Sequence, residues 1–124
     1  MTAQAEESLN LKIVAQIESS NNPKAYNRKS KATGLYQITP ICLKHYNQVH
    51  GTSYVREDLY DPELNTRIAI WYFTWLWQRG LPNLDMILAS YNWGLSNVRA
   101  YLKGEKEMPK ETINYIKKYH KLKG

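Results

Sequence analysis

Cysteine and phenylalanine are almost missing from this chain, which has one of each among its 124 residues. Because Cys42 stands alone, no intrachain disulfide and no cysteine-based metal site can form, and packing has to hold the fold. There is no H-E-x-x-H motif and no glycine-rich phosphate loop, and His45, His50 and His120 do not cluster with acids in the sequence. We therefore expect neither a metal nor a cofactor.

Long hydrophobic runs and a concentrated basic stripe are missing too. The longest apolar run, Ile68 to Trp77, has about half the length that a membrane span needs, so none is expected. The net charge is +6, but the lysines are dispersed except for a cluster near the C-terminus. Such a cluster is typical of a solvated face, and a nucleic-acid partner is not expected. The length fits a single domain, residues 1–124, and we expect a monomer.

Helical spacing of apolar residues dominates the pattern. The sequence predicts helices over residues 7–18, 40–50, 62–79, 83–91, 96–103 and 109–122. Thr39 before Pro40 and Asp61 before Pro62 are typical helix starts, and Gly51 is a typical helix end. Residues 25–38 are irregular and predict one or two short strands or loop arms. The expected fold class is α+β and predominantly α-helical.

Glu18 continues an apolar helical row that contains Leu11 and Val14, so the pattern places it away from the wet face of its helix. Burial and a nearby helix C-terminus both raise the pKa of a carboxyl group, and no Lys or Arg is close in sequence. A carboxylic acid with a raised pKa can serve as a general acid near neutral pH. The alternative is a surface glutamate that ends an amphipathic helix.

Three further segments offer amide, hydroxyl and aromatic groups that suit a sugar: Gly34-Leu35-Tyr36-Gln37-Ile38, Tyr91-Asn92-Trp93-Gly94 and Glu111-Thr112-Ile113-Asn114-Tyr115-Ile116. The Gln37 amide carries both a donor and an acceptor. Asn92 before Gly94 fits a ligand contact or an ordinary helix end, and Tyr115 fits a ligand contact or a core position.

Together with Glu18-Ser19, these segments resemble, in order and spacing, the lytic transglycosylases with an SLT-type, goose-type-lysozyme-like catalytic domain. That family reads E-S, G-L-M-Q, A-Y-N-A-G and E-T-x-x-Y-V, and the resemblance covers residues 11–119. It implies a lysozyme-like fold with a small β or loop element between the first two helices. It also implies non-hydrolytic cleavage of the MurNAc-β-1,4-GlcNAc bond of peptidoglycan, giving a 1,6-anhydro-MurNAc product with Glu18 as the single general acid and base.

The resemblance assigns substrate binding to six residues: Ser19, Tyr36, Gln37, Tyr91, Asn92 and Tyr115. The Ser19 hydroxyl could also hold a carbonyl or a neighbouring loop in place. The chain departs from the family pattern at Tyr36, which replaces Met and could still stack on a sugar, and at Trp93, which replaces Ala. Lys31 stands where Gly is common, and either Asn27 or Ser30 takes the place of the family Ser that hydrogen-bonds the glutamate.

Two other functions fit the same motifs: a muramidase that hydrolyses the same bond, and a non-catalytic peptidoglycan-binding module. The expected partners are peptidoglycan glycan strands, and the expected place of action is the bacterial cell wall, in the periplasm or outside the cell. The first seven residues are polar and acidic, unlike a secretory signal. This favours an excised domain, a phage protein or a secretion-system component.

Overall fold

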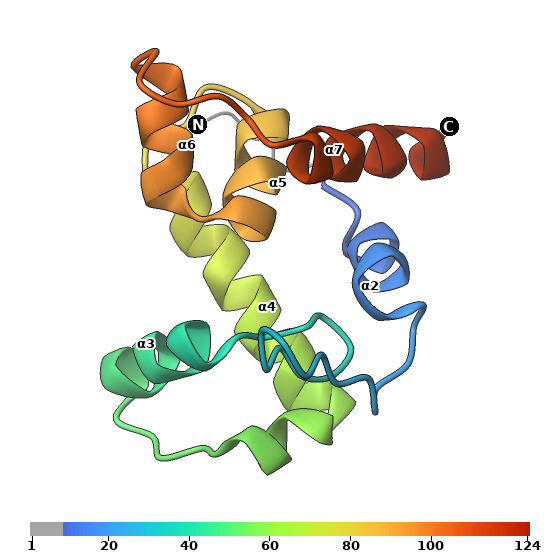
Figure 1. Cartoon of the computed structure of the whole chain (residues 1–124). Helices are drawn as coiled ribbons and strands as arrows, with labels where there is room; N and C mark the ends of the chain where they lie inside the picture. The colour runs from blue at the N-terminus through green and yellow to red at the C-terminus, as the bar shows by residue number, and fades with distance from the viewer. Residues whose placement is uncertain (1–8) are drawn as a thin grey trace. The chain divides into compact units, whose positions relative to one another are not determined.

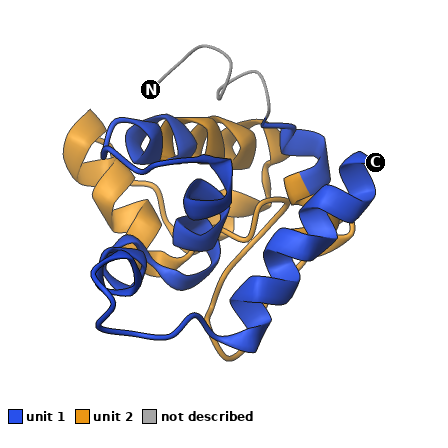
Figure 2. Ribbon diagram, turned by 90° about the horizontal axis from the view of Figure 1, so that it is seen from above, with its two compact units in different colours: residues 1–13, 73–124 blue, residues 14–72 orange. Residues whose placement is uncertain are grey.

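The computed structural model describes residues 9–124, and the chain forms two compact units (Figure 2). Among the described residues, the first unit combines residues 9–13 with Phe73–Gly124, and the second is Val14–Tyr72. The boundary falls within helices α2 and α4. The single-domain assignment stays a prediction. Between residues 9 and 124 the structure is mainly helical, and its β structure is limited to isolated bridges.

The second unit contains most of α2 (Leu11–Ser19), then α3 (Pro40–His50), the 3-10 helix η1 (Arg56–Tyr60) and the start of α4 (Pro62–Trp77) (Figure 1). Both predicted ends of α3 are confirmed: Thr39 Oγ1 accepts the Cys42 N–H at 3.2 Å, and Gly51 closes the helix at φ 64°. The helix η1 was not predicted. Apolar side chains from all of these elements form the core of the unit, with Val14, Ile38, Leu43, Leu59 and Ile68 among the buried ones.

The prediction for the start of α2 was wrong. The helix begins at Leu11 because Asn10 caps it, with Asn10 Oδ1 accepting the Lys12 N–H at 3.0 Å. A capping side chain sits outside the helix that it caps, so the predicted start at Glu7 was too early. Residues 7 and 8 of that prediction lie outside the described part of the chain. The helix ends at Ser19, one residue past the predicted end.

Residues 25–38 form loop arms, one of the two predicted alternatives. Two isolated antiparallel bridges join them, Tyr26 to Thr33 and Thr33 to Ile38. Thr33 and Ile38 exchange both of their N–H···O hydrogen bonds at 3.0 Å. The four residues between them, Gly34–Gln37, therefore form a closed turn, which we call the Gly34 turn.

The first unit is built from α5 (Leu84–Trp93), α6 (Leu95–Leu102) and α7 (Lys110–Lys123), with the end of α4. Helix α5 packs against both α6 and α7. It runs two residues further than predicted because its last hydrogen bond joins the Gly94 N–H to the Ser90 carbonyl at 2.9 Å. Helix α4 ends two residues earlier than predicted, at Trp77, where the Arg79 N–H bonds the Leu76 carbonyl in a tighter turn.

Ser90 is a buried serine in α5 whose hydroxyl has no hydrogen-bond partner among the described residues. An unpaired buried polar group costs about 1–3 kcal/mol. We therefore expect Ser90→Ala to raise the free energy of unfolding by about 1 kcal/mol, measured by urea denaturation. The exposed Ser96→Ala in α6 measures the gain from helix propensity alone. A stability gain no larger than that of Ser96→Ala would show that the Ser90 hydroxyl is satisfied.

Candidate functional site

The Glu18-Ser19 segment lies against the Gly34 turn. Ser19 Oγ donates a hydrogen bond to the Leu35 carbonyl at 2.7 Å and also lies 3.2 Å from the Ala15 carbonyl. The contact brings together two motifs that are 16 residues apart in sequence. The Ser19 hydroxyl therefore holds a neighbouring loop in place, which is one of the two roles expected from the sequence. The other role, a contact with substrate, stays a prediction.

Glu18 lies half-buried in the last turn of α2, one turn after the buried residues Val14 and Ala15. Its place at the end of the apolar row is as the sequence predicted. The two candidate partners for its carboxyl group take part in their own loop. Asn27 Oδ1 accepts the backbone N–H groups of Lys29 and Ser30, and Ser30 Oγ accepts the Ala32 N–H. The role of Glu18 as an acid stays a prediction.

The Gln37 side chain stabilises the turn in which it lies. Its Nε2 donates to the Gly34 carbonyl at 3.0 Å and to the Ala25 carbonyl at 3.3 Å. Both partners are acceptors, so the nitrogen of the amide has to face them. The Nε2 donor is therefore used within the turn, and a substrate contact by Gln37 stays a prediction.

Tyr36 is buried, with 5% of its surface exposed. Burial raises the pKa of its hydroxyl, and a hydrogen bond with the Thr66 side chain partly offsets that increase. So little of the ring is exposed that its main role is packing beneath the turn. The sequence suggested a stacking surface here, and a sugar contact by Tyr36 stays a prediction.

Asn65 in α4 is a site residue that the sequence analysis missed. Its side chain is fully buried and makes three hydrogen bonds: Nδ2 donates to the carbonyls of Thr33 and Leu59, each at 2.9 Å, and Oδ1 accepts the Tyr36 N–H at 2.8 Å. Asn65 in α4 thereby holds the Gly34 turn through Thr33 and Tyr36, and it also bonds η1 through Leu59. The feature of the sequence that could have revealed Asn65 is its position: a polar amide within the apolar face of a predicted helix.

In the first unit, the third and fourth motifs also meet. Thr112 Oγ1 on α7 donates to Asn92 Oδ1 near the end of α5 at 2.9 Å. Tyr115 lies three residues further along α7 and is buried. The Tyr91 ring stacks on Phe73, with ring centroids 4.3 Å apart. The Thr112 hydroxyl uses one of the two acceptor positions of the Asn92 oxygen, and a substrate contact by Asn92 stays a prediction.

The four motifs are therefore joined in two pairs, one in each unit. Glu18, Ser19, Tyr36 and Gln37 belong to the second unit, whereas Tyr91, Asn92 and Tyr115 belong to the first. Thr112 belongs to the fourth motif, but the sequence gave no reason to expect a role for it. Its hydroxyl links the third motif to the fourth, as Ser19 links the first to the second.

Ser19→Ala should loosen the Gly34 turn. The variant removes the donor to the Leu35 carbonyl, and one net hydrogen bond contributes about 1 kcal/mol. We expect hydrogen exchange of the Gln37 and Ile38 amides to accelerate by roughly fivefold, since their N–H groups close the turn. Ser53→Ala, an exposed serine of the same unit, is the control. Unchanged exchange at both amides would show that Ser19 does not anchor the turn.

Metal clusters and membrane spans are both absent from residues 9–124. In this part of the chain no group of three or more His, Cys, Asp or Glu side chains is placed to hold a metal ion. Nor does any helix there have the length and apolar character to cross a bilayer. Burial raises the pKa of the Cys42 thiol to about 12, so this group stays protonated and unreactive in the folded state.

The chain matches the family model described as transglycosylase SLT domain over residues 2–114. It is similar to the crystal structure of the 70-kDa soluble lytic transglycosylase from Escherichia coli, with 28% identity and a TM-score of 0.75. It is also similar to a complex of the 70-kDa soluble lytic transglycosylase with bulgecin A, with 29% identity and a TM-score of 0.74. Each match covers 86% of this chain and 19% of the other.

No curated protein matches the chain. The chain spans about a fifth of the length of the solved structures that it resembles. Those structures confirm the predominantly helical, lysozyme-like fold that was expected from the sequence. Since the family model covers most of its residues, the chain belongs to the transglycosylase SLT domain family.

Proposed function

We propose that this chain is a lytic transglycosylase catalytic domain that cleaves the MurNAc-β-1,4-GlcNAc bond of peptidoglycan. The observation that carries the proposal is the Ser19–Leu35 hydrogen bond, which holds the Glu18-Ser19 segment against the Gly34 turn. Membership of the family supports it. The place of action that follows is the cell wall, outside the cytoplasm.

In the proposed reaction Glu18 gives its proton to the glycosidic oxygen while the bond from that oxygen to the anomeric carbon breaks. The oxygen of the MurNAc 6-hydroxyl then bonds to the anomeric carbon, and the Glu18 carboxylate takes the hydroxyl proton. The carboxyl group is thereby restored, water is not consumed, and the product is 1,6-anhydro-MurNAc. One carboxyl group suffices, whereas most glycosidases need two.

The Gln37 and Asn92 amides each have a group that a sugar contact in its own unit could use. In the second unit the Nε2 of Gln37 bonds the turn, so its Oε1 suits an N–H or hydroxyl donor of the glycan. In the first unit the Oδ1 of Asn92 accepts from Thr112, so its Nδ2 suits a carbonyl or hydroxyl oxygen of the glycan. We propose that these two amides bind acetamido or hydroxyl groups of the glycan.

Purified sacculi and bulgecin A together test the proposal. The protein should release soluble muropeptides from sacculi, and bulgecin A, which is bound in the solved complex of the relative, should bind and slow that release. Binding to sacculi and to bulgecin A with no release of fragments would make the chain a peptidoglycan-binding module. Failure to bind either would remove the proposed substrate class.

A further inference from the structure

Helix α7 of the first unit, red in Figure 1, packs its less polar side against the rest of that unit. Thr112, Tyr115 and Tyr119 are buried, and α7 lies against α5. These three residues follow one another at helical spacing, so they share one side of α7. The opposite side of the helix faces solvent.

The exposed side of α7 carries a row of lysines. Lys110, Lys117 and Lys121 are exposed, and intervals of seven and four residues place them on one line along a helix. At a rise of about 1.5 Å per residue, this line is about 16 Å long. Lys118 is exposed beside it, one turn before Lys121. We call these four residues the α7 lysine row.

The α7 lysine row has no counter-charge in the part of the chain that the structure describes. Within residues 9–124 no hydrogen bond or ion pair engages any of its four ammonium groups. Helix α7 contains five lysines and a single acid, Glu111. The exposed side of the helix is therefore strongly basic.

The electrostatics of the helix does not account for the row. Cations are favourable near a helix C-terminus and unfavourable near its N-terminus, yet Lys110 is the first residue of α7. Like charges three or four residues apart repel one another, and Lys121 stands at these intervals from Lys118 and Lys117. The row thus has an electrostatic cost that a bound polyanion would offset.

The shape of the row suits one thin, linear polyanion. Its charges lie along a single line, whereas a nucleic-acid duplex presents two strands of phosphates. No aromatic ring is exposed in the row for a base to stack on, since Tyr115 and Tyr119 are buried. Ile113 and Leu122 are exposed, but nine residues put them on opposite sides of the helix. They therefore do not form the apolar face with which a helix lies in a bilayer surface.

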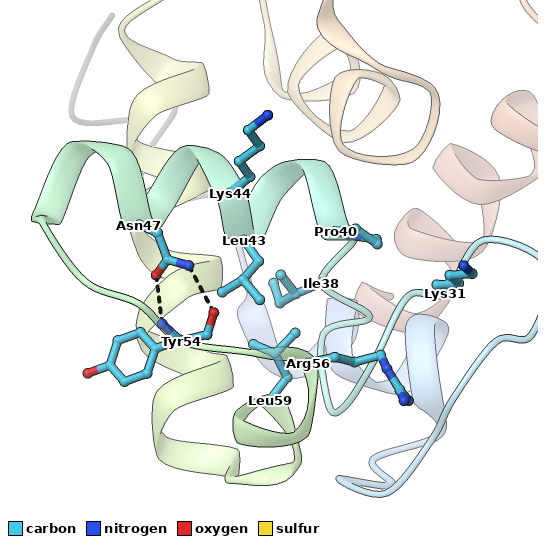
Figure 3. A pocket seen from close by; sticks show the side chains of 9 residues that line it. All are labelled: Lys31, Ile38, Pro40, Leu43, Lys44, Asn47, Tyr54, Arg56 and Leu59. Carbon is cyan, nitrogen blue, oxygen red and sulfur yellow. Dashed lines mark hydrogen bonds between the residues drawn. The ribbon is translucent and has the colours of Figure 1, made fainter.

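The basic residues of the second unit are arranged differently. Lys31, Lys44 and Arg56 line one pocket there, and in Figure 3 the charged ends of Lys44 and Arg56 extend to different sides. Arg56 also bonds the Glu57 carboxylate at 3.0 Å. These cations do not form a line along one element, as the α7 lysine row does.

We propose that the α7 lysine row binds a linear polymer of polyol units joined by phosphodiesters, the kind of anionic chain that many cell walls attach to peptidoglycan. The polymer lies along the helix, and each ammonium group pairs with a phosphate. Since the row is opposite the buried side that contains Tyr115, the polymer leaves that side of α7 untouched. The inference rests on the proposed function, because the proposed glycan substrate brings the attached polymer to the protein. Binding of the polymer then raises the local concentration of the domain on the glycan.

The direct test is calorimetric titration with poly(glycerol phosphate). The row variant Lys110→Gln, Lys117→Gln, Lys121→Gln removes three charges, and glutamine has nearly the helix propensity of lysine. Its thermal unfolding should not be weakened, because repulsion between like charges is removed. We expect its affinity to be about tenfold lower at low ionic strength, the combined effect of three exposed ion pairs. The difference should shrink at high salt.

The matched control removes three exposed lysines from other elements: Lys12→Gln on α2, Lys44→Gln on α3 and Lys103→Gln at the end of α6. It has the same net charge as the row variant and should keep most of the parental affinity. Equal losses in the two variants would show that net charge alone attracts the polymer, and would overturn the inference. An unchanged affinity in the row variant would overturn it too.

Two further probes distinguish the source of the phosphates. They are single-stranded DNA with the same number of phosphates, and vesicles of phosphatidylglycerol and phosphatidylcholine. We expect the parent to bind neither more tightly than poly(glycerol phosphate). Tighter binding to the DNA or to the vesicles that is lost in the row variant would assign the row to a nucleic acid or to a membrane instead.

Sacculi that carry the polymer, and sacculi stripped of it with hydrofluoric acid, connect binding to cleavage. The row variant should release muropeptides more slowly than the parent from the first and at the parental rate from the second. Equal slowing on both, or none on either, would overturn the inference. If the parent cleaves neither kind of sacculus but binds poly(glycerol phosphate) through the row, the proposed function fails and the binding site stands.

Discussion

Glu18→Gln should release no soluble muropeptides from sacculi while unfolding at the same temperature as the parent. Glutamine keeps the shape and the hydrogen-bonding capacity of the side chain, but it has no proton to give to the glycosidic oxygen. General acid–base catalysis contributes about 10²–10⁴-fold, and in this reaction one group serves both steps. We therefore expect the rate to fall by at least about a thousandfold, measured as muropeptide release over time.

Glu105→Gln is the matched control, since this exposed glutamate belongs to the short segment between α6 and α7. It makes the same chemical change and should leave the rate at the level of the parent. Binding of bulgecin A by Glu18→Gln would show that the site is still formed. A Glu18→Gln protein that kept most of the parental rate would remove Glu18 from the mechanism.

Gly34→Ala should strongly destabilise the second unit. Gly34 has φ 84°, and a Cβ added there would overlap the Asn65 Nδ2 and the Leu59 carbonyl oxygen. The left-handed backbone costs about 1–2 kcal/mol for a residue with a Cβ, and forcing extra atoms into packed surroundings adds roughly 1–3 kcal/mol. We expect the free energy of unfolding to fall by about 2–5 kcal/mol, measured by urea denaturation.

The Gly51→Ala variant distinguishes backbone strain from the overlap of an added Cβ with its neighbours. Gly51 also has a positive φ, 64°, but a Cβ there meets nothing within 4 Å. It should cost only the backbone strain, about 1–2 kcal/mol. Alkylation of the buried Cys42 thiol gives an independent measure of opening in the same unit. If both alanine variants lost the same stability, the packing of Gly34 against Asn65 would not constrain the turn.

Local signals in the sequence were enough for the ends of α3. Thr39, Pro40 and Gly51 act through the backbone of their own helix, so their effect does not depend on the rest of the fold. The start of α2 was misplaced because its cap, Asn10, lies inside a stretch that also has helical spacing. Periodicity alone cannot show which residue of such a stretch turns its side chain back onto the backbone.

The sequence predicted that the Ser19 hydroxyl could hold a neighbouring loop, but it did not predict the hydrogen bonds of the other motif residues. Gln37 was expected to offer a ligand both a donor and an acceptor, whereas its Nε2 bonds the Ala25 and Gly34 carbonyls in the folded turn. Asn65 was missed because its partners lie up to 32 residues away, and only the folded chain brings them within reach. Spacing predicts which residues share a helix face, and it does not predict how a loop uses its polar groups.

The most direct test that this chain acts as a transglycosylase is the mass of the products that it releases. Sacculi are digested in water enriched in heavy oxygen, and the muropeptides are analysed by mass spectrometry. We expect 1,6-anhydro-MurNAc ends, each lighter by one water than a reducing end and free of heavy oxygen. Reducing MurNAc ends that carry heavy oxygen would contradict it and make the protein a hydrolase.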